Sequence, residues 1–380
     1  MTSIDTGAVQ PAGVPTARPR RVLIVSGSVG AGHDGAAQEL AHRLRVAGEV
    51  ARVRDFVAAV PAPASTLIRD TYKSTVSHLP AAFDLVFRRL ESDGLFWRAE
   101  QMICALGAPT VRSWVAEFEP DLIVSTYPLA SQCLGGLRVT GSLDVPVLTY
   151  LTDPAVHRSW LHPGVAAHLT VTAAAARQGA AVYGVPMTTA GPLVPARFAS
   201  AASPARLAAL RAELDLPAGR PVALLGAGSL GMGDVLPTVA DVLATGAVPV
   251  VLCGRNRRLR RQVAARSGAV ALGWRTDVHE LMQLADLLVQ NAGGLSCTEA
   301  MVAGLPTLTY RPIPGHGRAN AAVLDDAGLA PWVRNPAELR TAMRRLGSRP
   351  HVPPVLPDPT DVVRAALASG EARSGFPAAA

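Results

Sequence analysis

A glycine-rich segment that ends in histidine follows the first strand-like segment of the chain. The sequence "SGSVGAGHDGAA" covers residues 26–37, after "RVLIV" and before a helical pattern predicted from Asp34 to Ala47. Glycines before a helix leave backbone N–H groups and a partial positive charge open to anionic or oxygen-bearing ligands. The same field disfavours a protonated imidazole, so His33 is expected to stay neutral, as a general base requires. The alternative is that His33 only caps its turn.

A second glycine run, "LLGAGSLGMG", offers a different chemistry. Gly226, Gly228 and Gly231 have the G-x-G-x-x-G spacing of a dinucleotide site after a strand-like segment. Such a site usually places an acidic residue at the end of the next strand, whereas this strand ends in Arg255. Only an NADP-like site fits that residue. An NADP-dependent oxidoreductase is therefore an alternative, although no group for hydride transfer is evident.

The third glycine run, "VQNAGGLSCTEAMVAGLPTLTY", joins a strand, an Asn-Ala-Gly-Gly turn, a helix expected to open at Ser296, and a further strand. Ser296 and Glu299 have the spacing of a capping box, which is one interpretation of the glutamate. The other is that its carboxylate faces the ends of the strands and accepts hydrogen bonds from a ribose diol. The amide ends of this helix and of a helix expected after Gly228 would then hold a diphosphate without a metal.

Charge and composition limit the classes of protein. The 380 residues include 36 Lys and Arg against 29 Asp and Glu, a net charge of +7, so anionic partners are expected. The arginine runs "RPRR" and "CGRNRRLRRQ" lack interleaved aromatic residues, and no zinc-finger or RNP-like pattern occurs, so nucleic acid is not expected as a partner. Four isolated cysteines suit a reducing compartment. Residues 1–17 form an expected disordered leader without the apolar core of a signal peptide, and no apolar run is long enough for a membrane span.

Short apolar segments alternate with helical patterns along the chain, and the alternation restarts after "GPLVPARFASAASPAR". This pattern is typical of parallel sheets with crossover helices. We predict an α/β protein with two facing, doubly wound Rossmann-like domains. Their expected ranges are 18–197 and 206–355, with a tail over 356–380 that returns to the first domain. Two such domains would bind ligands in the cleft between them, at the carboxyl ends of their strands.

Four segments in order resemble the glycosyltransferase-B enzymes of the monogalactosyldiacylglycerol synthase and diacylglycerol glucosyltransferase family, relatives of the N-acetylglucosaminyltransferase that makes lipid II. They are "SGSVGAGH", "EPDLIVSTYP", "LTDPAVHRSW" and "NAGGLSCTEAMVAGLP", the last followed by "IPGHGRAN". The resemblance implies a glycosyltransferase-B fold and an inverting transfer of a hexose from a UDP-sugar to a lipid hydroxyl. No cofactor and no metal are expected, because no D-x-D motif is present.

The resemblance also assigns residues. His33 is the candidate base, with Asp153 and His157 as alternatives or supports, and the resemblance places the ribose near Glu299. The donor residues it implies are Gly228, Ser229, Arg255, Gly293, Gly294, Ser296, Glu299 and His316, and the acceptor or membrane residues are Gly30, Gly32, Phe96, Trp97 and Trp160. Family members commonly carry a polar pair such as Gln-Glu after "PG" to hold the sugar hydroxyls, whereas this chain has His316 and Gly317. The identity of the donor sugar stays open.

The stretch from Ser65 to Phe118 concentrates aromatic and basic residues in an aromatic-poor chain, with Phe83, Phe87, Phe96, Trp97 and Trp114 among Lys73, Arg88, Arg89 and Arg98. Apolar and basic residues at helical spacing suit an interfacial helix on anionic lipid, although core packing with a solvated face gives the same pattern. We therefore expect a UDP-hexose, a lipid acceptor and an anionic membrane surface as partners, at the cytoplasmic face of the membrane. A sugar-nucleotide-binding protein without transferase chemistry is the non-enzyme alternative.

Overall fold

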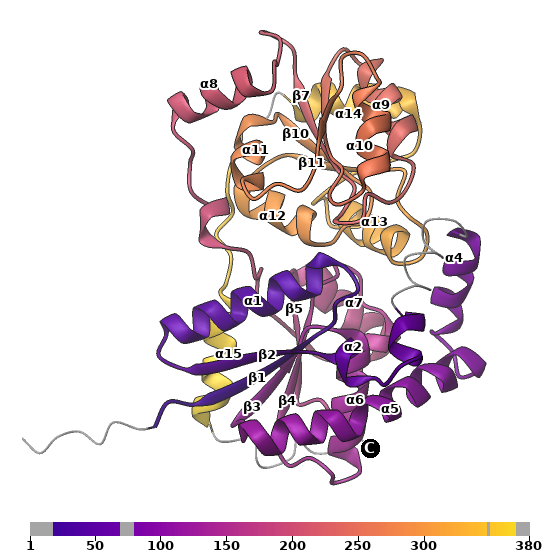
Figure 1. Cartoon of the computed structure of the whole chain (residues 1–380), viewed down its shortest axis with the longest axis vertical. Helices are drawn as coiled ribbons and strands as arrows, with labels where there is room; N and C mark the ends of the chain where they lie inside the picture. Colours follow the sequence, from indigo (N-terminus) through magenta and orange to yellow (C-terminus); the bar gives the residue numbers. More distant parts are fainter. Residues whose placement is uncertain (1–17, 69–79, 348–349, 370–380) are drawn as a thin grey trace, which may run out of the picture.

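Two parallel sheets, each covered by helices on both faces, form the two lobes of the molecule in Figure 1. The computed structural model describes residues 18–68, 80–347 and 350–369, so the predicted leader, Lys73 and residues 370–380 of the predicted tail lie outside the described residues. The predicted α/β class with two Rossmann-like sheets is confirmed.

The first sheet has the strand order β2-β1-β3-β4-β5-β6, and every neighbouring pair is parallel. Its strands read as apolar runs because both faces are buried; all five side chains of β4 are buried, for example. Its elements are β1 (Arg21–Ser26), α1 (Ala31–Val46), β2 (Val50–Asp55), α2 (Phe56–Ala59), α4 (Pro80–Arg89), α5 (Leu95–Phe118), β3 (Leu122–Ser125), α6 (Pro128–Val139), β4 (Val147–Leu151), η1 (Arg158–Trp160), β5 (Ala167–Thr170), α7 (Ala173–Tyr183) and β6 (Met187–Thr189).

The second sheet has the order β12-β11-β10-β7-β8-β9 and is also parallel throughout. Its strands and helices are connected to the first lobe by η2 (Ala196–Phe198). They comprise α8 (Pro204–Glu213), β7 (Val222–Gly226), α9 (Val235–Leu243), β8 (Val248–Leu252), α10 (Arg257–Ala264), β9 (Val270–Leu272), α11 (Val278–Leu284), β10 (Leu287–Gln290), α12 (Leu295–Ala303), β11 (Thr307–Tyr310), α13 (His316–Asp326), β12 (Trp332–Val333) and α14 (Pro336–Leu346).

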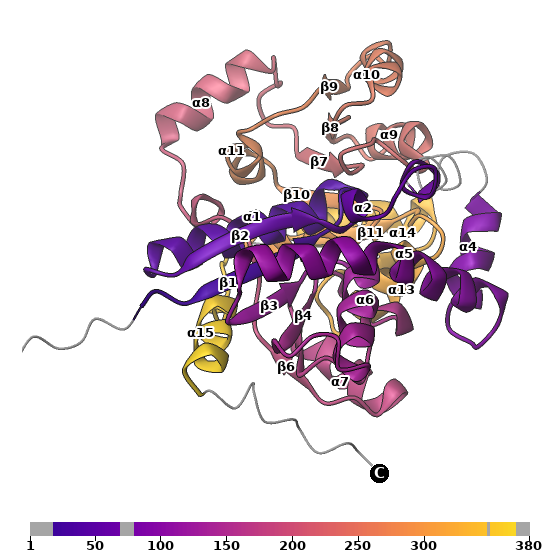
Figure 2. The same ribbon diagram turned by 60° about the horizontal axis from the view of Figure 1, so that its bottom comes forward.

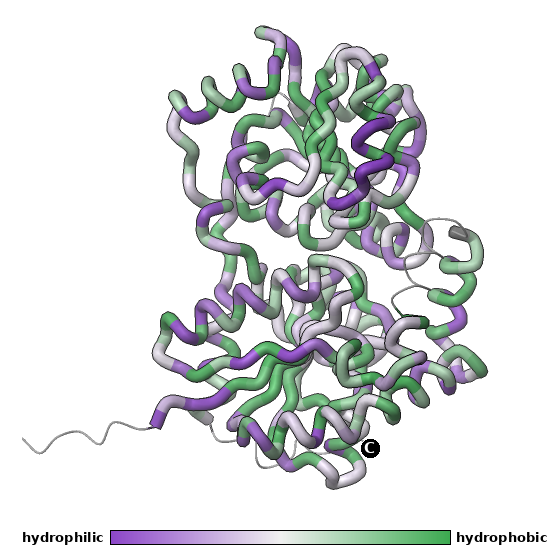
Figure 3. The backbone as a smooth tube through the Cα atoms, in the orientation of Figure 1, coloured by the Kyte–Doolittle hydropathy of each residue, from purple (hydrophilic) through white to green (hydrophobic). Residues whose placement is uncertain are grey.

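The hydrophobic cores lie between the sheets and their helices, and Figure 3 shows the apolar strands at the centre of each lobe. The last described helix, α15 (Pro359–Ser369), lies beside the first sheet in Figures 1 and 2. Val363 and Leu367 of α15 are buried with residues of α1 and β1. The chain thus crosses between the lobes twice, through 190–196 and through 353–358.

Arg43 of α1 bridges the two crossings. Its guanidinium donates to the Asp358 carboxylate at 2.9 Å and to the Val194 carbonyl at 2.5 Å. The helix that begins at the cleft is therefore held at its far end to both connections between the lobes.

In each sheet the strand order reverses beside the first strand of the lobe. β1 lies between β2 and β3, and β7 lies between β8 and β10. Loops that leave neighbouring strands in opposite directions open a crevice at this point, which is where doubly wound sheets bind ligands. The two crevices face each other, so the segments after β1 and β3 meet those after β7 and β10.

Candidate active site

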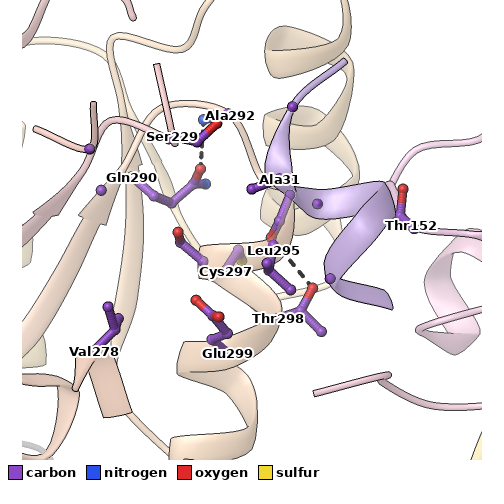
Figure 4. A pocket seen from close by; sticks show the side chains of 18 of the residues that line it. Ala31, Thr152, Ser229, Val278, Gln290, Ala292, Leu295, Cys297, Thr298 and Glu299 are labelled. Carbon is purple, nitrogen blue, oxygen red and sulfur yellow. Dashed lines mark hydrogen bonds between the residues drawn. The ribbon is translucent and has the colours of Figure 1, made fainter. Parts of the chain in front are cut away.

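A cavity of about 490 Å³ lies between the lobes at this meeting point. Its walls include residues 29–33 and 152–153 of the first lobe and 226–230, 273–276 and 290–299 of the second. Figure 4 shows α12, with Thr298 and Glu299, facing the first turn of α1 near Ala31. Gly35 permits this approach, because a Cβ there would come within 3.1 Å of Leu295, whereas a Cβ at the predicted Gly32 would make an ordinary contact with Leu295 at 3.8 Å. The predicted Gly30 lines the same cavity and precedes α1 with a φ of 109°, a conformation that favours glycine.

His33 lies in the first turn of α1, which begins at Ala31 and not at Asp34 as predicted. Its Nδ1 is 2.8 Å from the Thr126 carbonyl oxygen and 3.0 Å from Thr152 Oγ1. A carbonyl oxygen can only accept, so Nδ1 carries the proton and donates to Thr126, and Nε2 keeps its lone pair. The side chain is thus bonded to the segment after β3, whereas the capping alternative would bond it to its own turn.

Burial lowers the pKa of His33, while the negative charge of Asp153 acts in the opposite direction. The sequence predicted a neutral imidazole from the field of the helix; the larger physical cause is the loss of solvent around the ring. A neutral ring with an unprotonated Nε2 at the wall of a cavity can accept a proton from a bound hydroxyl group.

Asp153 lines the cavity and is held by a residue of the other lobe. Asn320 of α13 donates from Nδ2 to Asp153 Oδ1 at 3.3 Å and to the Ala292 carbonyl at 2.8 Å, and its Oδ1 accepts from the Ala155 N–H at 2.9 Å. The side chain is 1% exposed. Asn320 therefore fixes the segment that carries Asp153 against the glycine turn after β10. Sequence reasoning missed it, although it ends the quoted segment "IPGHGRAN".

His157, predicted as an alternative or support for the base, and Trp160, predicted as an acceptor or membrane residue, do not line the cavity. His157 Nδ1 accepts from the Ser159 N–H at 3.2 Å, and its Nε2 lies 3.0 Å from the Phe87 carbonyl and 3.1 Å from Glu91 Oε1. The Nδ1 atom thus caps η1, and the Nε2 atom contacts α4 and the turn after it. Trp160 is 1% exposed, with its ring centroid 5.8 Å from that of His33. It supports the histidine from the core and cannot contact a membrane.

The glycine run of the second lobe does not open a helix directly. α9 begins at Val235, so residues 227–234 form a loop in which Gly228, Gly231 and Gly233 have positive φ values. The helix expected after Gly228 is α9, whose start at Val235 is separated from Gly228 by this loop, so the glycine run does not open a helix as a dinucleotide fingerprint does. Gly228 and Ser229 still line the cavity.

Arg255 lies outside the cavity wall, and its guanidinium stacks over Trp274 at 4.7 Å from the ring centroid. Its backbone N–H donates to the Ser229 carbonyl at 3.0 Å, so the segment after β8 supports the glycine loop. Trp274 itself lines the cavity and is 52% exposed. It was missed in the sequence, although it directly follows the strand-like "AVALG" and aromatic residues at strand ends are candidates for ligand contact.

In the turn after β10, the side-chain amide of Gln290 binds backbone N–H groups of the turn. Gln290 Oε1 accepts from the Ala292 N–H at 2.8 Å and also from the Gly293 N–H (Figure 4). The Gly293 amide is thus already bonded, whereas Leu295 and Ser296 lie in the first turn of α12, whose N–H groups have no helical acceptor. The Gly293 amide is therefore already used within its turn, and the first turn of α12 offers further amide groups to an anion beside the predicted Gly294.

Glu299 is not part of a capping box, because α12 begins at Leu295 with Gly294 as its N-cap and no side chain caps it. The carboxylate instead points into the open space on the Val278 side of α12 (Figure 4). Burial raises the pKa of Glu299 to about 8, and the charge of Arg197 opposes this shift. An ionised Glu299 therefore gains from a ligand that donates hydrogen bonds to it.

His316, the first residue of α13, lines the cavity beside the histidine and aspartate of the first lobe. Burial lowers its pKa, and Asp153 opposes the shift. Its ring packs edge-on against Phe83 of α4, with centroids 5.7 Å apart. The α4 helix thus contacts the second lobe at His316, where the chain lacks the polar pair that family members commonly carry.

The predicted interfacial stretch forms α4 and α5 where it is described. Trp97 lies beneath the Arg158 guanidinium, 4.0 Å from its ring centroid, and Trp114 packs on the core, so neither is an open membrane contact. Phe96 is 37% exposed. A more exposed stripe follows one side of α5 and combines apolar with basic side chains, at Leu95, Arg98, Met102, Leu106 and Arg112.

Among the described residues, no helix is both long and apolar enough to cross a bilayer. Within the same ranges, no group of three or more histidine, cysteine, aspartate or glutamate side chains is arranged to hold a metal ion. The four cysteines are buried and unpaired with one another.

Comparison with known proteins agrees with this geometry. A family model described as monogalactosyldiacylglycerol (MGDG) synthase matches residues 33–192. Monogalactosyldiacylglycerol synthase 3 of Arabidopsis thaliana is 25% identical over 84% of this chain and 73% of its own. Processive diacylglycerol beta-glucosyltransferase of Bacillus subtilis is 24% identical over 63% of this chain and 64% of its own.

Among solved structures, MurG of Acinetobacter baumannii superposes with a TM-score of 0.55 over 92% of this chain and all of its own, at 16% identity. This likeness shows the shared fold. The family model and the two relatives show that the chain is similar to monogalactosyldiacylglycerol synthases and diacylglycerol glucosyltransferases, so the resemblance seen in the sequence is confirmed.

Proposed function

We propose that this protein transfers a hexose from a UDP-sugar to the hydroxyl group of a diacylglycerol-type lipid, with inversion at the anomeric carbon. The observation that carries the proposal is the pairing across one cavity of a neutral, fixed His33 with Glu299 and the amide end of α12. One relative named above is a monogalactosyldiacylglycerol synthase and the other a diacylglycerol glucosyltransferase, and both names support the choice of acceptor.

The second lobe would hold the donor. The first turn of α12 and the loop at Gly228 and Ser229 offer amide groups to the diphosphate, and the helix field favours negative charge there. Glu299 would accept hydrogen bonds from the two ribose hydroxyls, which favours its ionised form against the effect of burial. Trp274, which also lines the cavity, offers an aromatic face to the uracil base of the donor.

The first lobe would supply the base. The lipid hydroxyl oxygen attacks the anomeric carbon, the bond from that carbon to the phosphate oxygen breaks, and UDP leaves with the electron pair. His33 Nε2 takes the hydroxyl proton, while Nδ1 keeps its hydrogen bond to the Thr126 carbonyl. The Asp153 charge stabilises the imidazolium that forms, and amide groups stabilise the leaving diphosphate without a metal.

The acceptor would reach the cavity from a bilayer. The exposed stripe on α5 and Leu85 of α4, which is 45% exposed, lie on the helix pair that contacts His157 and His316. Apolar side chains flanked by arginine suit the interface of an anionic leaflet. We propose the cytoplasmic face of the membrane as the place where this contact forms.

The direct test is an assay with labelled UDP-glucose, UDP-galactose and UDP-N-acetylglucosamine and diacylglycerol in mixed micelles, with and without EDTA. We expect one donor to give a glycolipid whose anomeric configuration is opposite to that of the donor, with turnover unchanged by the chelator. Retained configuration would contradict the single displacement. Loss of activity with EDTA would contradict the amide account of the leaving group.

The same preparation distinguishes the alternatives. UDP binding by calorimetry without transfer to any lipid would indicate a sugar-nucleotide-binding protein. Binding of NADPH in place of UDP would indicate the oxidoreductase, which the loop at 227–234 does not favour.

A further inference from the structure

The α10 helix of the second lobe carries a concentration of positive charge that the proposed chemistry does not use. Residues 255–266 contain six arginines, and no aspartate or glutamate occurs between Asp241 and Asp277. These six positive charges nearly equal the net charge of the whole chain, which is +7. Figure 3 shows it as the most hydrophilic helix of its lobe.

The arginines lie on the solvent side of a well-anchored helix. Leu259 and Val263 are buried in the core against the sheet. Arg257, Arg258 and Arg261 lie on the opposite side of the helical wheel and are exposed. Among the described residues, no carboxylate lies within ion-pair distance of any of the six arginines. This contrasts with Arg275 nearby, which is paired with Asp277 and Glu213.

The helix is also bonded to the wall of the donor cavity. Asn256 caps α10 through the Leu259 N–H and donates to the carbonyls of Leu230 and Gly231, both at 3.3 Å. A Cβ at Gly231 would clash with Leu259 and Asn256, so the glycine loop lies directly against the start of the helix. A surface that binds α10 therefore orients the donor-binding lobe.

We propose that the arginine face of α10, defined as Arg257, Arg258 and Arg261, is a second contact with an anionic lipid bilayer, separate from the α4 and α5 helices of the first lobe. In Figure 1, α10 lies in the right part of the upper lobe and α4 at the right edge of the molecule, and in Figure 2 α10 lies at the top and α4 at the right edge. A bilayer in contact with both helices would therefore touch both lobes. The partner is lipid because exposed arginines without interleaved aromatic side chains bind charge but provide no platform for stacked bases. This inference rests on the proposed lipid acceptor for its biological sense, but its measurement needs no transfer.

The test compares vesicle binding of the full chain with two charge-matched triple variants. R257Q/R258Q/R261Q removes the arginine face and keeps residues that favour helix. R177Q/R211Q/R340Q removes the same charge from α7, α8 and α14 as a control. With sedimented vesicles of phosphatidylglycerol and phosphatidylcholine, we expect the α10 variant to bind about 10- to 100-fold more weakly, since each basic side chain near an anionic surface contributes about 1 kcal/mol. The control variant should lose much less.

UDP affinity measured by calorimetry should be the same in both variants, which shows that the donor lobe is folded. Hydrogen exchange supplies a readout on the native chain: amides over 257–264 should exchange more slowly with phosphatidylglycerol vesicles than with phosphatidylcholine alone. Equal losses in the two triple variants, or unchanged exchange in α10, would overturn the proposal. A loss of DNA binding by the α10 variant with unchanged vesicle binding would assign the face to nucleic acid and overturn it as well.

These outcomes are independent of the proposed transferase activity. If no donor and lipid pair reacts while α10 still binds anionic vesicles, the proposed function fails and the lipid contact stands. If glycolipid forms while α10 neither binds anionic vesicles nor is protected from exchange, the proposed function stands and the lipid contact of α10 fails.

Discussion

The two glycine turns that flank the cavity follow corresponding strands at the edge of each crevice, but only the first opens a helix at once. After β1, α1 begins at Ala31 and its first turn carries His33. After β7, the glycines form a loop and α9 begins only at Val235, while the helix end that faces the cavity belongs to α12 after β10. A similar glycine pattern thus positions a side chain in one lobe and shapes a wall in the other.

The difference follows from what each turn packs against. Gly35 allows the first turn of α1 to pack closely against Leu295 of the other lobe, so this helix end lies at the cleft. In the second lobe, a Cβ at Gly254 would meet the Ser229 and Gly228 backbone, and the loop is filled by the segment that leads to α10. The first lobe therefore specialises in a reactive side chain, and the second in backbone amides and Glu299.

The largest expected effect comes from removing the base. His33→Ala should reduce kcat by about 10²- to 10⁴-fold, the range for loss of a general base. His42→Ala, at an exposed position on the same helix, is the matched control and should leave kcat unchanged. Steady-state kinetics with saturating donor and acceptor measure both. A near-normal kcat with a lower melting temperature in the first variant would mean that His33 is only structural.

The corresponding change in the second lobe acts on the donor. Glu299→Ala should weaken UDP binding by about 10- to 100-fold, because hydrogen bonds to a charged group contribute about 1.5–3 kcal/mol. Glu299→Gln keeps the size of the side chain but not its charge, and it should fall between the native chain and the alanine variant. Equal UDP affinity in all three would exclude Glu299 from the donor site.

The two lobes should also differ in pH dependence. Burial lowers the pKa of His33 below its ordinary 6.5. The kcat should therefore rise with pH up to the lowered pKa and be level above it. Glu299 has a pKa raised to about 8 in the unliganded protein, and its ionised form is the acceptor, so donor affinity should rise by up to tenfold per pH unit until about pH 8. Profiles of kcat and of kcat/KM for the donor separate the two; a single shared profile would contradict the assignment.

A smaller effect is expected at the bond between the lobes. Asn320→Ala leaves the Ala155 N–H and the Ala292 carbonyl without their partner, at a cost of about 1–3 kcal/mol in unfolding free energy. Because Asp153 loses its positioning, kcat should fall by about tenfold while UDP affinity changes little. Urea unfolding and steady-state kinetics report the two effects, and a variant with normal kcat would show that Asp153 needs no support from α13.

The smallest effect concerns the membrane face. Replacing Leu95, Met102 and Leu106 with serine should lower binding to anionic vesicles several-fold and lipid glycosylation with it, without a change in UDP affinity, since the stripe is remote from the cavity. Trp97→Ser tests a different contact, because that ring lies beneath Arg158. If the triple variant binds vesicles normally while F96S/W97S does not, the stripe on α5 is not the docking surface.

Sequence patterns were sufficient for what depends on neighbours along the chain. Alternating apolar strands and helices predicted both sheets, and the glycine turn predicted that His33 would stand at a helix start. The differences between expectation and structure arose where distant segments meet. His157 and Trp160 read as site residues beside Asp153, but the contacts to Phe87, Glu91 and the core that redirect them come from other elements. Asn320 carries no local signal, because its partners lie 28 or more residues away.

The central claim is that the base and the donor site belong to opposite lobes of one cavity, and calorimetric titration of UDP into His33→Ala and Glu299→Ala tests it most directly. The account predicts that His33→Ala binds UDP with native affinity although its turnover is reduced, whereas Glu299→Ala binds UDP about 10- to 100-fold more weakly. Weakened UDP binding in His33→Ala with native binding in Glu299→Ala would contradict it.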